Sequence, residues 1–312
     1  MSVVRIAFLG TPEFARYHLA SLLADSHYEV VGVVTQPDRP SGRNMHLNPS
    51  PVKVLAQTHG LKVISPESIK NKEALDEIAS WKAEAAIVVA YGQIVPQDFL
   101  DLFPRKVVNV HASLLPRWRG AAPIQRAIEA GDKTTGVSLQ VMVHKLDAGA
   151  VIGSYALPIG ENMNSFELHN ELMPLGAKLL AVDFMDYLRG HLTPTLQNEI
   201  LVTYAHKIEK AEAKINWSLS AEKIDCHIRA MVMGPGSFAL HSGKKLKIIR
   251  AKREPVLSGQ PGQILEVAKD SFVVACGEGA LRVLEVQPES RAKMSVEDYL
   301  RGHSVQKGDM LS

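Results

Sequence analysis

Residues 3–12 read Val-Val-Arg-Ile-Ala-Phe-Leu-Gly-Thr-Pro, a short apolar run that ends in a turn. The stretch after it, Glu13 to Ala24, has its apolar residues at helical spacing. The alternation recurs, with helix-like stretches such as Lys72 to Lys82 between further apolar runs at Tyr28 to Thr35, Ala85 to Ala90 and Val107 to Val110. Such alternation is typical of a parallel sheet with right-handed crossovers. We therefore predict an α/β fold with a Rossmann-like, mostly parallel sheet and flanking helices.

The second half of the chain changes character. Phe166 to Leu188 keeps helical spacing, whereas Leu192 to Ile208 loses it and contains Pro194. Short strand candidates follow at Lys244 to Ile249, Gly262 to Glu266, Phe272 to Ala275 and Leu281 to Val286. Closely spaced short strands favour a small β-barrel. We predict a first domain over residues 1–191, a linker over residues 192–208 and a C-terminal β-barrel domain over residues 209–312.

Composition excludes several classes of protein. The chain has 312 residues, 46% of them hydrophobic, which is enough for two cores. Cys226 and Cys276 lie far apart, so neither a disulfide framework nor a thiolate zinc site is suggested. The first strand follows no basic leader, and no apolar run is long enough to cross a bilayer. We expect a cytoplasmic monomer with no membrane partner.

The turn at Gly10-Thr11-Pro12 has neither Gly-x-Gly-x-x-Gly nor a Walker lysine, so it does not indicate a dinucleotide or ATP site.

Charge is distributed unevenly. The net charge is +2, but residues 206–312 carry seventeen Lys and Arg against thirteen Asp and Glu. Six cations and no acid lie within Lys244 to Arg253. Such a surface can neutralise several phosphates of a nucleic acid. A solvated edge strand that lysines protect against aggregation would show the same pattern, and the sequence leaves both open.

Polar residues interrupt an apolar strand at residues 107–120, which read Val-Val-Asn-Val-His-Ala-Ser-Leu-Leu-Pro-Arg-Trp-Arg-Gly. Strand alternation places Asn109 and His111 on one face. An amide donates without titrating and an imidazole donates or accepts near neutral pH, so the pair suits stabilising an oxyanion beside a proton transfer. The pair could equally hold a loop at the end of a strand.

A carboxylate follows a second strand. Residues 137–142 read as a strand, and Asp147 comes after it in a turn that ends at Gly149. Ligands of open α/β sheets bind at that edge, where Asp147 could reach His111, orient it and accept a proton. Taken alone, an Asp before Ala-Gly is more often a plain turn residue.

Together these segments resemble a known family. The Asn-x-His strand with Ser-Leu-Leu-Pro after it, and the later Leu-Asp-x-Gly, look like the formyl-transfer site of enzymes that use N10-formyltetrahydrofolate. The likeness covers nearly the whole chain, including residues 5–15, 36–43, 90–93, 117–126 and 213–217. It is greatest to members that formylate the α-amine of methionyl initiator tRNA. It implies that His111 and Asn109 stabilise the oxyanion, that Asp147 takes the amine proton, and that the C-terminal domain is an OB-fold-like tRNA-binding domain.

The resemblance also implies two binding surfaces. The loop after residue 90 can offer backbone groups to a flat heterocycle, although it also reads as a helix start near Pro96. By resemblance the folate cosubstrate contacts Phe14, Ala90, Tyr91, Gln93, Val95, Ser113, Leu114, Leu115 and Pro116. The tRNA contacts would be Arg39, Arg43, Lys53, Lys207, Lys210, Lys244, Lys245 and Lys247, with Arg43 at the weakly paired first position of the acceptor end. We expect no metal, because the histidines show no ligand spacing.

Two departures and several rivals qualify this picture. Residues 231–236 read Met-Val-Met-Gly-Pro-Gly, where the family usually has Asn-Pro-x-Pro-Gly, and residues 44–46 read Asn-Met-His where Gly and Lys are common. A formyltransferase acting on a small amine, such as an amino sugar or a ribonucleotide, would keep the Asn109, His111 and Asp147 site without needing the basic barrel. A folate hydrolase and a noncatalytic RNA-binding protein are further alternatives.

Overall fold

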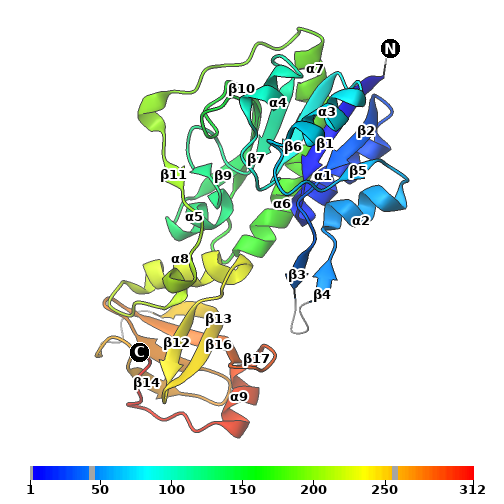
Figure 1. The fold of residues 1–312 in the computed structure, drawn as a ribbon. Coiled ribbons are helices and arrows are strands. Elements are labelled where there is room, and N and C mark those ends of the chain that lie inside the picture. Colours follow the sequence, from blue (N-terminus) through cyan, green and yellow to red (C-terminus); the bar gives the residue numbers. More distant parts are fainter. Residues whose placement is uncertain (1–2, 42–45, 255–258) are drawn as a thin grey trace. The chain divides into compact units, whose positions relative to one another are not determined.

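The computed structural model describes residues 3–41, 46–254 and 259–312 (Figure 1). The chain forms two compact units. The sheet unit consists of residues 1–120, 134–158 and 169–204, and the C-terminal unit consists of residues 121–133, 159–168 and 205–312. Each unit is therefore assembled from segments that are distant in the sequence.

The sheet unit is built on seven strands in the order β10-β9-β7-β6-β1-β2-β5. Their bounds are β1 Val4–Gly10, β2 Tyr28–Val34, β5 Val63–Ile64, β6 Ala85–Val89, β7 Val107–His111, β9 Thr134–Val141 and β10 Val151–Pro158. Strands β5, β2, β1, β6 and β7 run parallel, while β9 and β10 are antiparallel additions beside β7. The strand order reverses between β1 and β6, which is the place where open α/β sheets bind ligands.

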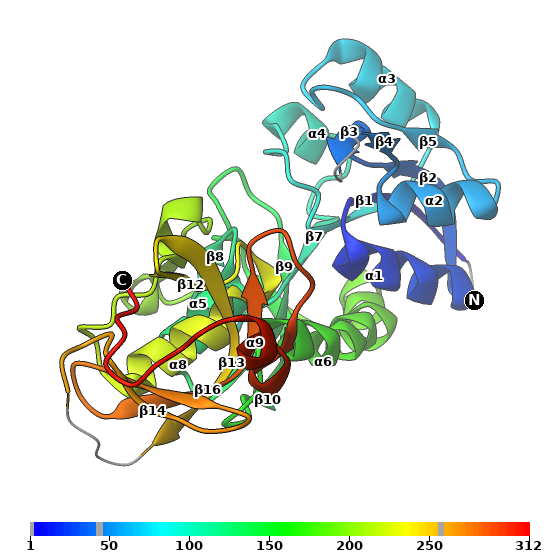
Figure 2. The same ribbon diagram turned by 90° about the horizontal axis from the view of Figure 1, so that it is seen from below.

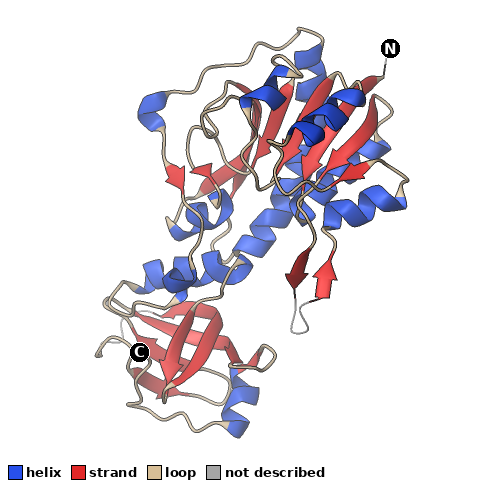
Figure 3. Cartoon of the chain, viewed as in Figure 1, coloured by secondary structure: helices blue, strands red, loops and turns tan. Residues whose placement is uncertain are grey.

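Helices alternate with these strands because each crossover must cover an apolar face of the sheet (Figure 3). They are α1 Glu13–Ala24, α2 Pro51–Thr58, α3 Lys72–Ser80, α4 Gln97–Asp101 and α6 Ser165–Lys178, the last continuing through a π-helical segment, Leu179–Phe184, into α7 Met185–Leu188. All of β6 is buried. Short strand pairs complete this part of the chain: β3 Arg39–Ser41 with β4 His46–Asn48, and β8 Arg119–Gly120 with β11 Tyr204–Ala205.

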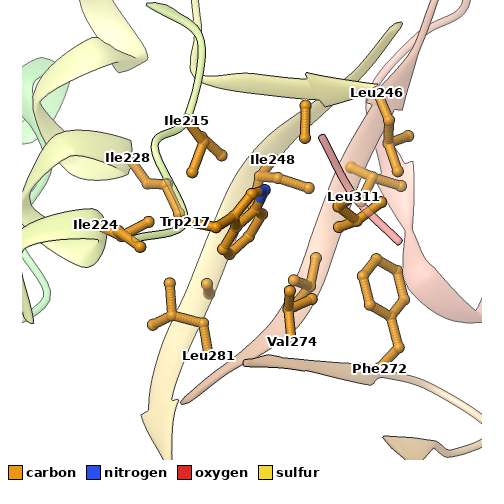
Figure 4. Close-up of a cluster of buried hydrophobic side chains, with 14 of the residues drawn as sticks. Ile215, Trp217, Ile224, Ile228, Leu246, Ile248, Phe272, Val274, Leu281 and Leu311 are labelled. Atoms are coloured by element: carbon orange, nitrogen blue, oxygen red, sulfur yellow. The ribbon is translucent and has the colours of Figure 1, made fainter. Parts of the chain in front are cut away.

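The C-terminal unit contains an antiparallel sheet in the order β12-β13-β16-β15-β14, with β17 paired to β16. Its elements are α5 Pro123–Glu129, α8 Ala221–Ala230, β12 Phe238–His241, β13 Lys244–Glu254, β14 Ile264–Val267, β15 Phe272–Ala275, β16 Ala280–Pro288, β17 Met294–Ser295 and α9 Val296–Gly302, with 3-10 turns at Lys210–Ala213 and Met231–Met233. In Figure 2 the long strand β13 is visibly curved. Trp217 lies in the core with Ile224 of α8 and Ile248 of β13 (Figure 4).

The predicted fold class is confirmed: a mixed, mostly parallel sheet with flanking helices is followed by a curled antiparallel sheet, a half-barrel. The helix predicted over Glu13 to Ala24 and the strand predicted over Phe272 to Ala275 have the expected bounds. Leu246 and Lys247 of β13 pair with both β12 and β16, while the described strand pairs of Arg250 to Arg253 are with β16. The edge-strand interpretation of Lys244 to Arg253 therefore stays open. Residues 192–208 carry a 3-10 turn, Glu199–Leu201, and strand β11. A domain division at that segment stays a prediction.

Candidate active site

Strand β7 carries the first two candidate residues. It lies between β6 and β9, and its apolar side chains are buried on both faces of the sheet. Asn109 is half-buried and the His111 side chain is 7% exposed. Both side chains face Asp147, as the two-residue period of a strand requires.

Asp147 is held from three sides. Its Oδ1 accepts hydrogen bonds from Gln140 Nε2 at 2.9 Å and Asn109 Nδ2 at 3.4 Å, and its Oδ2 accepts one from the backbone N–H of Gly120 at 2.9 Å. The side chain is 13% exposed. A carboxylate offers about four lone-pair sites, so one acceptor position is left free after these three bonds. The group is fixed in place and can still take a proton.

The ring of His111 has a second partner besides Asp147, the neighbour that we expected. Its Nε2 lies 2.8 Å from the backbone oxygen of Trp118, and its Nδ1 lies 3.7 Å from Asp147 Oδ2. A carbonyl oxygen only accepts, so Nε2 carries a proton and, in the neutral ring, Nδ1 has none. His111 Nε2 therefore donates the hydrogen bond to Trp118 O that sets the ring orientation. Asp147 Oδ2, at 3.7 Å, is too far from Nδ1 for a hydrogen bond but close enough to form an ion pair with the protonated ring.

The backbone around the site is unusual. Ala90, Trp118 and Asp147 have φ values of 45°, 64° and 45°, which are left-handed conformations that cost non-glycine residues free energy. At Gly149 a Cβ would lie 1.6 Å from the backbone oxygen of Val141. The Leu-Asp-x-Gly turn thus needs glycine because another backbone passes against it.

Residues 113–116, expected to contact folate, form a loop held by β9. Ser138 Oγ donates to Ser113 O at 2.8 Å and accepts from Leu115 N at 3.1 Å. Ser113 Oγ donates to Arg117 O at 2.6 Å, and the peptide bond between Leu115 and Pro116 is cis. Both serine hydroxyls hold the loop, which leaves Leu114 to Pro116 as the part that can meet a ligand.

The loop after β6 supplies the other folate candidates. Tyr91 O accepts from Thr11 Oγ1 at 2.8 Å, which joins the ends of β6 and β1. The amide of Gln93 is occupied, because its Oε1 accepts from Ile69 N and its Nε2 donates to Pro66 O. The Tyr91 hydroxyl is buried without a partner among the described residues, and burial raises its pKa to about 12. Val95 is buried beside Tyr91 in the same apolar cluster.

Phe14 on α1 is also buried, and its ring lies against the rings of His18 and His169 with centroid distances of 4.7 and 5.4 Å. Ala90, with its left-handed backbone, forms the corner of the loop. The loop is followed by α4, whose first turn begins after Pro96. The helix start that the sequence offered as an alternative is therefore present beside the candidate pocket.

The candidate tRNA contacts fall in both units. In the sheet unit, Lys53 Nζ pairs with Asp38 Oδ2 at 2.7 Å and Arg39 donates to Gln36 Oε1 at 3.2 Å. Arg43, with its neighbours Asn44 and Met45, lies outside the described residues.

In the C-terminal unit the lysines make few charged contacts. Lys207, Lys210 and Lys244 are exposed. Lys245 Nζ lies 3.8 Å from the centroid of the Phe238 ring, a cation–π contact. The described residues show no ion pair for Lys244, Lys245, Lys247, Lys207 or Lys210. They also contain no group of three or more His, Cys, Asp or Glu side chains placed to hold a metal ion.

Sequence reasoning missed three residues around Asp147. Gln140 stands directly opposite Asn109 in the antiparallel pair of β9 and β7. With Ser138, it is a polar residue within the apolar run of its own strand, a signal that could have been read. Gly120 and Trp118 contribute backbone atoms only, which residue type does not reveal.

Comparison with known proteins identifies the class. A family model described as formyl transferase matches residues 4–182, and a second, described as formyl transferase C-terminal domain, matches residues 207–304. The chain therefore belongs to the formyl transferase family. Similar proteins from Bdellovibrio bacteriovorus and Magnetococcus marinus are both named methionyl-tRNA formyltransferase. They are 57% and 43% identical to this chain over 316 and 311 residues, and each match covers 100% of this chain and 99% of the relative.

Solved structures share the fold. An N-formyltransferase from Helicobacter canadensis in complex with folinic acid and dTDP-3-aminofucose matches with a TM-score of 0.67 and 19% identity, over 92% of this chain and 100% of that one. HypX from Aquifex aeolicus in complex with tetrahydrofolic acid matches with a TM-score of 0.65 and 17% identity, over 100% of this chain and 51% of that one. The described residues contain no helix that is both long and apolar enough to span a membrane.

Proposed function

We propose that this protein catalyses the methionyl-tRNA formyltransferase reaction, moving the formyl group of N10-formyltetrahydrofolate to the α-amine of methionyl initiator tRNA. The observation that carries the chemistry is the convergence of Asn109 and His111 on Asp147 at one edge of the sheet. The acceptor is supported by relatives of 43% to 57% identity along the whole chain that bear this name. Sugar and ribonucleotide formyltransferases share the fold at 17% to 22% identity only.

In this mechanism the uncharged amine attacks the formyl carbon and a C–N bond forms. Asn109 Nδ2 and a protonated His111 Nδ1 donate to the resulting oxyanion, each worth about 3 kcal/mol when well placed. Asp147 accepts the amine proton at its free acceptor position and balances the imidazolium charge across 3.7 Å. The bond from the carbon to N10 then breaks, and N10 takes the proton that Asp147 had accepted, so that tetrahydrofolate leaves and the carboxylate is restored.

The folate is bound by the two loops at the ends of β6 and β7. Ala90, Tyr91, Gln93 and Val95 would enclose the pterin with backbone groups and apolar side chains. The residues from Ser113 to Pro116 would cover its other side, and Phe14 would support the pocket from α1. Since the Gln93 amide is already bonded to residues 66 and 69, its role would be to shape the pocket.

The tRNA is bound by phosphate contacts from both units. Arg39, Arg43 and Lys53 would meet the acceptor end near the formyl donor, and Lys207, Lys210, Lys244, Lys245 and Lys247 would meet the phosphates of the stem. Replacing Arg43 by Ala should weaken the use of charged tRNA far more than the reaction with a minimal amine. Equal losses with the two acceptors would argue against a role at the acceptor end.

The experiment is transfer of labelled formyl from 10-formyltetrahydrofolate to methionyl initiator tRNA, run beside elongator methionyl-tRNA, an amino sugar nucleotide and glycinamide ribonucleotide. We expect preferential labelling of initiator tRNA. Labelling of a small amine alone would overturn the acceptor and keep the site chemistry, and no labelling of any acceptor would overturn the activity.

The setting of the enzyme is part of the same proposal. Its two substrates meet in the cytoplasm, and the chain acts there as a monomer. Light scattering should give a mass near 34.1 kDa for the free protein, and a mass twice as large would contradict the monomer.

A further inference from the structure

A buried charge is linked by hydrogen bonds to the turn that carries Asp147, residues 145–149, called the Asp147 turn below. The side chain of Arg119 is 0% exposed. Its Nε and Nη2 donate to Gln197 Oε1 at 3.0 and 2.8 Å, and Nη2 also donates to Glu199 Oε1 at 2.8 Å. A buried guanidinium is costly unless it is paired, so its partners are fixed features of the fold. Both come from the segment that sequence reasoning treated as a linker.

Gln197 connects this charge to the backbone of the turn. Its Nε2 donates to Asp147 O at 2.8 Å and to Gly149 O at 2.7 Å. A guanidinium only donates and a carbonyl only accepts, so these partners fix which end of the amide points where. The two shorter bonds of the amide nitrogen go to the carbonyls that flank residue 148, and Gln140 Oε1 lies 3.4 Å from the same nitrogen.

The turn needs such a hold. Asp147 has a left-handed φ of 45°, a conformation that costs about 1 kcal/mol or more for a residue with a Cβ. Lys145, earlier in the same turn, pairs with Glu199 Oε2 at 2.9 Å. Glu199 therefore contacts the start of the turn, and Gln197 contacts its end. Hydrogen bonds from Arg119 and Lys145 lower the pKa of Glu199 to about 2, which keeps it ionised.

We propose that Arg119, Gln197 and Glu199 form a clamp that positions Asp147 for catalysis, with Gln197 as its central positioning residue. The inference rests on the proposed role of Asp147 as proton acceptor. Residues 197–199 are then part of the active site's support, and their substitution should lower the rate of formyl transfer with little effect on the binding of either substrate.

The decisive variant is Gln197→Glu. It keeps an oxygen for Arg119 but replaces the amide nitrogen with an oxygen that cannot donate to Asp147 O or Gly149 O. We expect the single-turnover rate of formyl transfer to fall by about a hundredfold, as misplacement by about 1 Å does elsewhere, while KM for folate and tRNA changes little. Gln197→Asn, which shortens the reach by one methylene, should act in the same direction if the glutamate variant folds poorly.

Matched controls come from the same segment. Leu196 and Ile200 are 84% and 91% exposed, so Leu196→Ala and Ile200→Ala alter the chain beside Gln197 without touching the clamp. Both should keep the parent rate within about twofold. Melting temperatures of all variants separate lost rate from lost folding.

A double-mutant cycle distinguishes positioning from general loosening. With Asp147 already changed to Asn, adding Gln197→Glu should cost little more, because the residue that it positions has gone. A parent rate in Gln197→Glu, or a full additional loss in the double variant, would overturn the clamp. Failure of the proposed function would show differently, as absence of formyl transfer in the unmodified protein.

Discussion

The Asp147 turn and the basic strand β13 use charge in opposite ways. At the turn, Asp147 has three hydrogen-bond donors, and the backbone beside it is bonded to Gln197. On β13, Lys244, Lys245 and Lys247 make no ion pair within the described part of the chain. A site that must stabilise a brief charge gains from fixed groups. If β13 contacts the tRNA as proposed, unpaired lysines leave their charges available for phosphates.

The sharpest test of the turn is Asp147→Asn. It keeps the shape of the side chain but removes the proton acceptor, so we expect formyl transfer at saturating folate to fall by about 10² to 10⁴-fold. The exposed Asp101→Asn serves as the matched control and should keep the parent rate. An unchanged rate in Asp147→Asn would contradict the mechanism. It would also show that the fixed charge of the turn is not used in catalysis, which removes the contrast with β13.

Gly149→Ala tests whether the turn is as tightly fitted as the backbone indicates. The new Cβ would lie 1.6 Å from Val141 O, so the turn must shift. We expect a loss of about 3 kcal/mol in the free energy of unfolding, measured in urea, together with loss of activity. Gly302→Ala, where nothing lies within 4 Å, is the control and should change stability little. Similar stability of both variants would show that the turn yields easily.

Acid should weaken the sheet unit through His18. This side chain is fully buried, and desolvation lowers its pKa from the ordinary 6.5 to about 4. The unfolded chain therefore binds the proton first as the pH falls, and stability present above pH 6.5 is lost toward pH 4. We expect roughly 2 to 3 kcal/mol less stability at pH 4.5 than at pH 7.5 from this group. The variant His18→Gln should lose that part of the pH dependence. The same slope in both proteins would contradict the assignment.

The smallest effects per residue belong to the lysines. Replacing Lys244, Lys245 and Lys247 by Ala together should raise KM for tRNA and leave the single-turnover rate nearly unchanged. The slope of log affinity against log salt should fall by up to about 0.9 for each lost phosphate contact. Lys72→Ala, in an exposed pair with Asp76, is the control. A fall in rate without a change in salt dependence would place these lysines with the catalytic groups.

Several features followed from local pattern. The alternation of apolar runs and helical stretches predicted the parallel sheet, and the fold class and the family are both confirmed. The helical spacing of Phe166 to Leu188 corresponds to α6, a π-helical segment, Leu179–Phe184, and α7. Helical spacing does not distinguish such a segment from an α-helix over so few residues.

By itself, then, the sequence determined the fold class, the shared face of Asn109 and His111, and the family. The first two depend on residue spacing, which local geometry fixes, and the family on its motifs. Only the tertiary structure decided that Trp118 orients the His111 ring and that Gln197 bonds to the backbone of Asp147, fifty residues before it. Those contacts form only when the fold brings distant segments together. Because they involve backbone atoms, which every residue has, the residue types in the sequence do not indicate them.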